Sequence, residues 1–319
     1  MATQHDRGRV KVLSIVGTGR SGTTLLAAVL GEADGFFDAG ELHWAWSRSL
    51  LEQPPCGCGR RPADCPVWGA VIERALGITP EQHGSQRARD LARRVGADEK
   101  AVVSRRNRLR LLRSTDRPAP AWPALERMRA VFAQLCAGIV EVTGARVVID
   151  ASKRPEDAAA LAGVGFVDQY FLHVVRDPRA VVFSWSRVKS SPDGTSVMKR
   201  IRLPRVVLAW WESNASVELL RRRVPGDRWF FTTYEEFATR PRQVVAELIA
   251  FLGEDGEAPF VDDHTVALGV NHTLLGNPDR FRTGQIRITP DDAWRSCMPR
   301  YRRLGIRLAA LPLMRRYGY

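Results

Sequence analysis

The chain has 319 residues, 45% of them hydrophobic, and a formal net charge of +13 from 48 basic and 35 acidic side chains. This length supports one large α/β domain or two small ones. A charge of this size suits an anionic ligand, a nucleic acid or an acidic surface. The basic residues are spread along the whole chain, with no basic tail and no basic patch interleaved with aromatic residues. We therefore expect a small polyanionic cofactor and no nucleic acid.

Two features bear on the compartment. No apolar run approaches the roughly 20 residues needed to span a bilayer, so we expect no stable membrane insertion. The first nine residues are polar and lead directly into the first expected strand, without the pattern of a signal peptide. The expected location is the cytoplasm, where disulfides are rare.

Expected strands alternate with expected helices, which is typical of a parallel sheet with helices on both faces. The strands are expected at 10–16, 35–41, 146–150, 170–175 and 229–234. The helices are expected at 23–31, 86–113, 125–142, 155–162, 179–189, 206–223 and 241–252. We predict one three-layer α/β domain over residues 1–319, with its site at the carboxyl ends of the strands.

Residues 52–130 are the least regular part of the sequence. They contain a cysteine-rich segment, an Arg-rich helical stretch and a break at Pro118, Pro120 and Pro123. We interpret this region as a mainly helical insertion that covers the sheet and shapes the substrate pocket. The break at the prolines is alternatively the hinge of a lid.

Three of the five cysteines, Cys56, Cys58 and Cys65, lie within ten residues of one another. A zinc site normally has four ligands, so His43 or His83 would have to complete this set. The alternatives are a local disulfide or a tight loop of buried thiols. We favour a structural loop and expect no metal.

The segment after the first strand is rich in glycine and leads into a helix. This order forms an anion cradle, because glycines let the backbone approach closely and the N–H groups at the helix start point at the ligand. Gly17 and Gly22 have the spacing of a Walker A loop, but Thr23 stands where that motif needs Lys. Together with Gly19 the same glycines match a dinucleotide fingerprint, which is weak by itself.

A third interpretation uses all of residues 20–25, Arg-Ser-Gly-Thr-Thr-Leu. An Arg and hydroxyls beside backbone amides suit a 5′-phosphosulfate without a metal. The segment resembles the 5′-phosphosulfate loop of the sulfotransferase family that uses 3′-phosphoadenosine-5′-phosphosulfate (PAPS). The resemblance implies a P-loop NTPase-like sulfotransferase fold and PAPS as cofactor. It assigns cofactor binding to Gly19, Arg20, Ser21, Gly22, Thr23 and Thr24.

Two later strand ends extend the resemblance. Arg176 follows a buried strand, and Ser184 lies eight residues later on the next helix. A guanidinium and a hydroxyl can grip a phosphate, and the resemblance implies that this pair holds the 3′-phosphate of PAPS. Tyr234 matches a Tyr-Glu segment of the family and would contact the adenine. Alternatively, Arg176 is solvated at a capped helix and Tyr234 packs under the following helix.

A late loop at about 270–295 follows the last expected helix. Gly276 and Asn277 begin a turn, and Arg280 and Arg282 add two cations. The loop is similar to late loops of bacterial sulfotransferases that fold over the nucleotide and contact its 3′-phosphate. We assign all four residues to the cofactor and prefer Arg280 over Arg282.

The general base is expected near the transferring group. Gly40 and Glu41 match the Gly-Glu of tyrosylprotein sulfotransferases, whose carboxylate is the base. Cytosolic sulfotransferases use a His instead, so His43 and His173 remain alternatives. We prefer Glu41 because it matches by position and residue type, and we expect His173 to be a buried structural residue.

Two cations complete the predicted catalytic set. Lys153 ends a strand in a segment that resembles an Asp-x-Ser-Lys of related enzymes, in which the Lys lies beside the sulfonate. With Arg20 it would neutralise the charge on the oxygen that leaves sulfur. Alternatively, Lys153 is an ion-pair residue of the surface.

The resemblance, carried by motifs in family order, implies transfer of a sulfonate from PAPS to an acceptor hydroxyl of a glycan, glycolipid or small natural product. Adenosine 3′,5′-bisphosphate would be the product. The alternatives are a P-loop small-molecule kinase, which needs ATP and Mg²⁺, and a nucleotide-binding protein without turnover. Residues 42–130 and 185–215 are expected to line the acceptor pocket. The sequence leaves a homodimer open.

Overall fold

The computed structural model describes residues 9–113, 122–187, 189–190, 197–198 and 201–319. Its centre is a five-stranded sheet of order β2-β3-β1-β4-β7, in which every pairing is parallel. The strands are β1 (Val10–Gly17), β2 (Phe36–Gly40), β3 (Val147–Lys153), β4 (Val167–Val175) and β7 (Trp229–Thr233). Each coincides with an expected strand. Because all five run the same way, their carboxyl ends meet at one edge.

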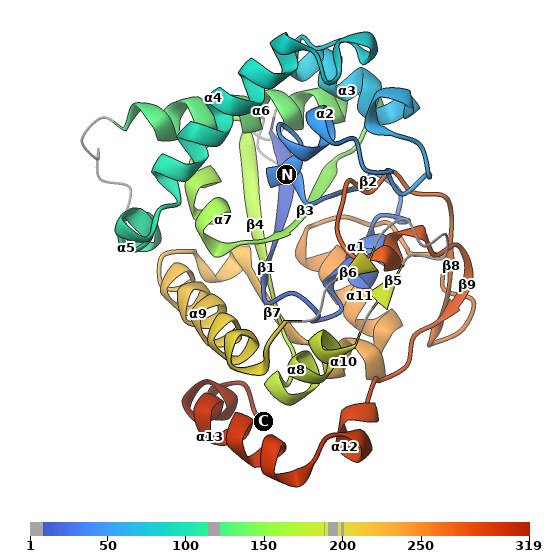
Figure 1. The fold of residues 1–319 in the computed structure, drawn as a ribbon. Helices are drawn as coiled ribbons and strands as arrows, with labels where there is room; N and C mark the ends of the chain where they lie inside the picture. Colours follow the sequence, from blue (N-terminus) through green and yellow to red (C-terminus); the bar gives the residue numbers. More distant parts are fainter. Residues whose placement is uncertain (1–8, 114–121, 188, 191–196, 199–200) are drawn as a thin grey trace.

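Helices cover both faces of the sheet (Figure 1), which confirms the expected three-layer α/β architecture. The α-helices of the described residues are α1 (Thr23–Leu30), α2 (Arg48–Leu51), α3 (Pro66–Leu76), α4 (Gln86–Val102), α5 (Arg105–Arg113), α6 (Pro123–Thr143), α7 (Pro155–Leu161), α8 (Pro178–Ser186), α9 (Leu203–Arg221), α10 (Tyr234–Thr239), α11 (Pro241–Phe251), α12 (Ala293–Cys297) and α13 (Arg300–Arg316). Short 3-10 turns are η1 (Leu42–Trp44), η2 (Pro62–Asp64), η3 (Pro80–Gln82), η4 (Gly226–Arg228) and η5 (Pro278–Phe281).

The alternation of side chains along β1 explains the three layers. Leu13 and Ile15 point into a core shared with α1 and α11, whereas Val12 points into the core under α6 and Val16 toward α9. All four side chains are at most 1% exposed. Full burial of one such side chain contributes roughly 1.5–3 kcal/mol, so a strand apolar on both faces has to lie between two helical layers.

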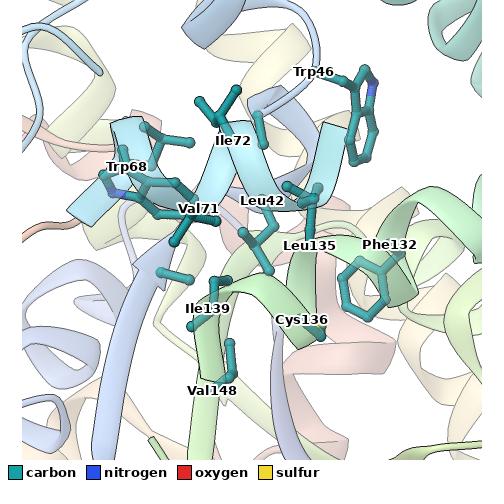
Figure 2. Packing of buried hydrophobic residues seen from close by; sticks show 14 of the residues in the cluster. Leu42, Trp46, Trp68, Val71, Ile72, Phe132, Leu135, Cys136, Ile139 and Val148 are labelled. Atoms are coloured by element: carbon teal, nitrogen blue, oxygen red, sulfur yellow. The ribbon is translucent and has the colours of Figure 1, made fainter. Parts of the chain in front are cut away.

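The segment from 52 to 130 contains α3, α4, α5 and the start of α6. Its helices α3 and α4 pack with α6 over the sheet edge formed by β2 and β3. Figure 2 shows side chains of α3 and α6 in this core, such as Ile72 and Leu135. The helix expected over 86–113 is two helices, α4 and α5. The Asn107 amide donates to the carbonyl of Ala101 at 2.6 Å, so a side chain takes a carbonyl near the end of α4. Pro118 and Pro120 lie outside the described residues, and Pro123 occupies the first turn of α6.

The late loop is not the last part of the chain with regular structure, contrary to the sequence expectation. Two small antiparallel pairs occur, β5 (Lys189–Ser190) with β6 (Val197–Met198) and β8 (Thr265–Leu268) with β9 (Gly284–Arg287). Residues 269–283, which include the first part of the late loop, lie between β8 and β9, and α12 and α13 follow this pair. Within the described ranges, no helix combines the length and apolar character that a membrane crossing requires.

Candidate functional site

A cavity of about 910 Å³ opens at the carboxyl edge of the sheet. Its wall comes from the segments that follow all five parallel strands and from residues 275–291. Eight cations and three carboxylates line it among the described residues, so its charge favours an anion. The cations are Arg20, Arg48, Lys153, Arg176, Arg187, Arg280, Arg282 and Arg287. The carboxylates are Glu41, Asp279 and Asp291.

Nearly all residues that the sequence assigns to the site lie at this cavity. Those that line it are Gly19, Arg20, Gly22, Thr23, Thr24, Glu41, Lys153, Arg176, Ser184, Tyr234, Gly276, Asn277, Arg280 and Arg282. Ser21 is the exception, since its side chain is fully buried and does not reach the cavity wall. The topology of the parallel sheet brings together residues that are up to 263 positions apart (282 − 19).

The turn between β1 and α1 needs its glycines. Gly17 has φ +137°, and a Cβ there would lie 2.4 Å from the carbonyl oxygen of Val174 on the neighbouring strand. Gly22 has φ +75°, and a Cβ there would lie 2.6 Å from the ring of Tyr234. Gly22 is also the residue before α1, so no side chain caps the N–H groups at the start of this helix. The turn therefore offers backbone donors to the cavity.

Arg20 combines a rare backbone conformation with a buried guanidinium. Its φ is +71°, which is rare for a residue with a side chain, and the residue is 8% exposed. Its Nε, Nη1 and Nη2 are buried without a hydrogen-bond partner among the described residues, and the guanidinium lies 4.8 Å from the Trp185 ring centroid. Burial lowers the pKa of Arg20, against the attraction of Asp279. A buried cation with unpaired donors is costly unless an anion joins it.

Glu41 and Lys153 form a half-buried ion pair, with Nζ 2.7 Å from Oε1. The other carboxylate oxygen of Glu41 accepts from Trp44 Nε1 at 3.2 Å, and Lys153 also donates to the carbonyl of Ala151. Burial by itself would raise the pKa of Glu41, but the charge and hydrogen bond of Lys153 outweigh it and lower the pKa. Glu41 is thus an ionised carboxylate at the cavity wall. Lys153 is an ion-pair residue, but of the cavity and not of the outer surface.

Arg176 connects the turn after β1 with the late loop. It donates from Nη1 to the carbonyl of Arg20 and from Nη2 to the carbonyl and carboxylate of Asp291, each at 3.1–3.2 Å. Its guanidinium stacks over the ring of Tyr234 at 4.0 Å, and its Nε is buried without a hydrogen-bond partner in the described part of the chain. Tyr234 therefore packs on Arg176, and Ser184 lines the cavity from α8.

The late loop is fixed to the rest of the cavity wall by Arg280. This buried side chain donates to the carbonyls of Gly276 and Pro55, at 3.0 and 3.1 Å. Arg282, two residues later, is exposed and lines the cavity. At least part of the Arg280 guanidinium therefore ties two backbone segments of the cavity wall together.

Neither of the two candidate histidines lines the cavity. His43 is 6% exposed and does not line it, and burial lowers its pKa to about 3, so the imidazole is neutral. His173 is fully buried in β4, 3.0 Å from Asn214 Oδ1. Burial lowers its pKa to about 4. Of the three candidate bases, Glu41 is the one that reaches the cavity.

Sequence reasoning did not find several residues of the cavity wall. Asp291 accepts from Arg187 as well as from Arg176, and no motif marks it. Arg187 comes three residues after Ser184, a helical spacing that could have revealed it. Arg48, the first residue of α2, lines the cavity beside the Trp44 ring.

Tryptophans from the segments expected to line the acceptor pocket lie in three different environments. Trp44 and Trp185 line the cavity. Trp46 and Trp210 are at most 2% exposed and belong to the core. Trp211 is 43% exposed and lies in an apolar groove between α9 and α13, away from the cavity.

Comparison with known proteins agrees with this geometry. A family model described as "Sulfotransferase family" matches residues 13–258, more than half of the chain. No curated protein sequence matches. Among solved structures, the sulfotransferase domain of the Synechococcus PCC 7002 olefin synthase is similar with a TM-score of 0.56 and 21% identity, covering 98% of this chain and 97% of that one.

The sulfotransferase domain of the curacin biosynthetic pathway is similar with a TM-score of 0.55 and 17% identity, covering 94% and 96% of the two chains. At these identities the two structures establish the fold, namely a central parallel sheet flanked by helices. The family match covers the anion-binding turn, the ends of all five strands and the ion pair of Glu41 with Lys153. This chain belongs to the sulfotransferase family.

Proposed function

We propose that the protein transfers a sulfonate from PAPS to an acceptor hydroxyl. The observation that carries the proposal is Arg20, a buried guanidinium whose three nitrogens have no hydrogen-bond partner among the described residues, in a turn with uncapped backbone donors. An oxyanion with several oxygens satisfies such a site. The absence of a Walker Lys at Thr23 favours a phosphosulfate over a nucleoside triphosphate with Mg²⁺.

In this proposal, different residues around the cavity bind different parts of PAPS. Gly19 to Thr24 hold the 5′-phosphosulfate, with Ser21 supporting the turn from the interior. Arg176 and Ser184 hold the 3′-phosphate, and Tyr234 lies beside the adenine. The late loop covers the nucleotide through its four assigned residues. Those residues are Gly276, Asn277, Arg280 and Arg282.

Glu41 acts as the general base in the proposed reaction. It takes the proton of the acceptor hydroxyl, whose oxygen forms the new bond to sulfur, while the bond from sulfur to the 5′-phosphate oxygen breaks. The electron pair of that bond stays on the leaving oxygen, and adenosine 3′,5′-bisphosphate departs. Arg20 and Lys153 stabilise the charge that develops there, which is where fixed cations have their largest effect.

The acceptor is a hydroxyl of a glycan, a glycolipid or a small natural product. Trp44 and Trp185 provide flat apolar surfaces in the cavity. Such rings stack on sugars and aromatic groups. Arg48 beside Trp44 adds a cation where a polar acceptor would enter.

Isothermal titration with adenosine 3′,5′-bisphosphate, beside 5′-AMP, ATP–Mg²⁺ and NAD, tests the donor. We expect binding that depends on the 3′-phosphate. Arg20→Met should weaken it by about 10- to 100-fold, the value of a lost charged hydrogen bond. The same substitution should raise the melting temperature of the ligand-free protein, because it removes a buried unpaired charge.

Arg93→Met is the matched control. Arg93 lies on α4 with 72% of its side chain exposed and does not line the cavity, so the control loses the same charge without touching the site. It should bind the nucleotide as the wild type does. Equal affinities for 5′-AMP and adenosine 3′,5′-bisphosphate would contradict the proposal, and phosphate transfer from ATP–Mg²⁺ would establish the kinase alternative.

A further inference from the structure

Three cysteines meet one histidine, which lies near the start of the late loop. The sulfurs of Cys56, Cys58 and Cys65 and one ring nitrogen of His272 all lie within 4.8 Å of one another. His272 is 207 residues after Cys65. The sequence singled out the cysteines but suggested His43 or His83 as the fourth ligand, and that suggestion is wrong. Spacing along the chain could not identify His272.

The distances within this cluster suit a tetrahedral ion. Cys56 Sγ and Cys65 Sγ are 3.8 Å apart, and His272 Nδ1 is 3.2 Å from Cys65 Sγ. Thiolates bound about 2.3 Å from a tetrahedral zinc lie about 3.8 Å from each other. Cys56 and Cys65 are at most 2% exposed, which shields the cluster from solvent.

The backbone around the cysteines is shaped to present them. The N–H of Cys56 donates to the carbonyl of Arg60, and Gly59, with φ +81°, returns its N–H to the carbonyl of Cys56. Gly57 donates to the carbonyl of Thr273 and leaves no room for a Cβ, which would lie 1.8 Å from Asn271 Oδ1. The cysteine loop is thereby docked against the strand-like segment that carries His272.

Groups around the ligand atoms support the same arrangement. Cys65 caps α3, and its sulfur accepts from the N–H of Trp68 at 3.4 Å. The indole N–H of Trp68 donates to the carbonyl of His272. Hydrogen bonds of this kind orient the ligands of metal sites and stabilise thiolate charge.

We propose that Cys56, Cys58, Cys65 and His272 bind one structural Zn²⁺. Three thiolates and an imidazole are a ligand set that zinc prefers, and four protein ligands leave no open position for substrate or water. Binding releases the thiol protons. The ion has no part in sulfonate transfer, so the proposal is independent of the proposed function.

The position of the ion suggests what it stabilises. Two residues after His272, Leu274 accepts from the N–H of Glu41 at 2.9 Å and donates to the carbonyl of Ala39. Pro55, next to Cys56, accepts from Arg280 of the late loop. The ion therefore joins the cysteine loop to the segment that holds both Glu41 and the late loop, and closes a loop of more than 200 residues.

Zinc content of the purified full-length chain tests the proposal. After dialysis against metal-free buffer with a phosphine reductant, elemental analysis should find about one zinc per chain. Cys58→Ser and His272→Gln should each lower zinc affinity by at least the roughly 10- to 100-fold that loss of a supporting group costs. Cys297→Ser is the matched control, because Cys297 is exposed and outside the cluster, and it should keep its zinc.

Cobalt binding by the wild-type protein tests the proposal even if the variants do not fold. Wild-type protein stripped of metal and reduced should take up one Co²⁺ and show the visible bands and thiolate charge-transfer absorption of tetrahedral sulfur coordination. Chelation should also lower its melting temperature. A reduced protein that holds no zinc and takes up no Co²⁺ would overturn the proposal. So would a Cys56–Cys65 disulfide in the freshly isolated chain, or full zinc retention in His272→Gln.

Discussion

Glu41 and Lys153 come from different strands and determine each other's charge. Lys153 has φ +65°, a strained value for a residue with a side chain, and this directs its ammonium to Glu41 and to the carbonyl of Ala151. The ion pair keeps Glu41 ionised but makes its carboxylate a weaker base, because it lowers the pKa of Glu41. A base of this kind works over a wide pH range because it does not protonate until the solution is acidic.

The pH dependence of sulfonate transfer should depend on the ion pair between Glu41 and Lys153. In the proposed reaction, the acid limb of kcat/KM reflects protonation of Glu41 in the free enzyme. Lys153→Met removes the ammonium that lowers the pKa of Glu41 and leaves burial, which raises it, so the limb should move to higher pH. Lys153→Arg keeps the ion pair and is the control, with a limb where the wild type has it. Measurement of kcat/KM from about pH 4 to about pH 8 checks the order of the three limbs.

The level of activity gives a second readout of the same pair. Glu41→Gln should lower kcat by about 100-fold or more, because it removes the proposed general base, while adenosine 3′,5′-bisphosphate still binds. A Glu41→Gln protein with wild-type kcat would show that another group takes the proton. If the acid limb of kcat/KM lies at the same pH in Lys153→Met as in the wild type, Glu41 is not the titrating group.

At the scale of elements, the turn from β1 to α1 depends on contact with a strand that follows some 200 residues later. Tyr234, directly after β7, packs against Gly22, and Arg176, directly after β4, stacks on Tyr234. The ends of β1, β4 and β7 are thus joined by a column of stacked residues, Gly22, Tyr234 and Arg176. A substitution at the turn should therefore displace Arg176, the cation assigned to the 3′-phosphate.

Gly22→Ala tests this coupling. The new Cβ would meet the ring of Tyr234 at 2.6 Å, and positive φ adds a cost of about 1 kcal/mol. Gly84→Ala is the matched control, because Gly84 has φ +71° and no atom within 4 Å of its Cβ position. Both variants should lose about 1 kcal/mol in urea unfolding from backbone strain, and Gly22→Ala should lose more.

Only Gly22→Ala should also bind adenosine 3′,5′-bisphosphate more weakly, since displacement of the Tyr234 ring moves Arg176. Titration calorimetry of both variants gives the comparison. If the two variants lose the same stability and keep the same affinity, the column does not couple the turn to the 3′-phosphate residues.

At the scale of the whole molecule, the core contains a histidine that resists charging. His173 is surrounded by the rings of Trp229, Phe231 and Tyr317 and interacts with Asn214. Burial lowers its pKa to about 4, from an unfolded value of about 6.5. Between these values the unfolded chain binds more protons than the folded one, so the free energy of unfolding falls as the pH falls.

This linkage gives a stability prediction. From pH 7 to pH 5, His173 should account for a loss of about 2 kcal/mol in the free energy of unfolding. His173→Gln cannot titrate, so it should be less stable at neutral pH but lose about 2 kcal/mol less on acidification. Urea unfolding at the two pH values measures the difference. Parallel losses in both proteins would mean that His173 does not carry the pH dependence.

Local patterns were enough to predict the framework of this protein. All five strands of the main sheet were expected, since each is a short β-branched or aromatic run, and their carboxyl ends predicted where the cavity lies. Helix ends were found where a proline marks the first turn, as in α7 and α11. The stripe Ile306, Ala310 and Met314 in α13 was missed, because six arginines and an internal proline obscure it.

What the sequence determined by itself was the order of strands and helices, the anion-binding turn and a set of site residues, because these depend on neighbours in the chain. Only the tertiary structure decided the partners of those residues: Lys153 pairs with Glu41, Asp291 holds Arg176, and His272 meets the cysteines. Each of these contacts joins segments more than 100 residues apart. No local periodicity records such a meeting, since packing of the sheet and its helical layers is what brings the segments together.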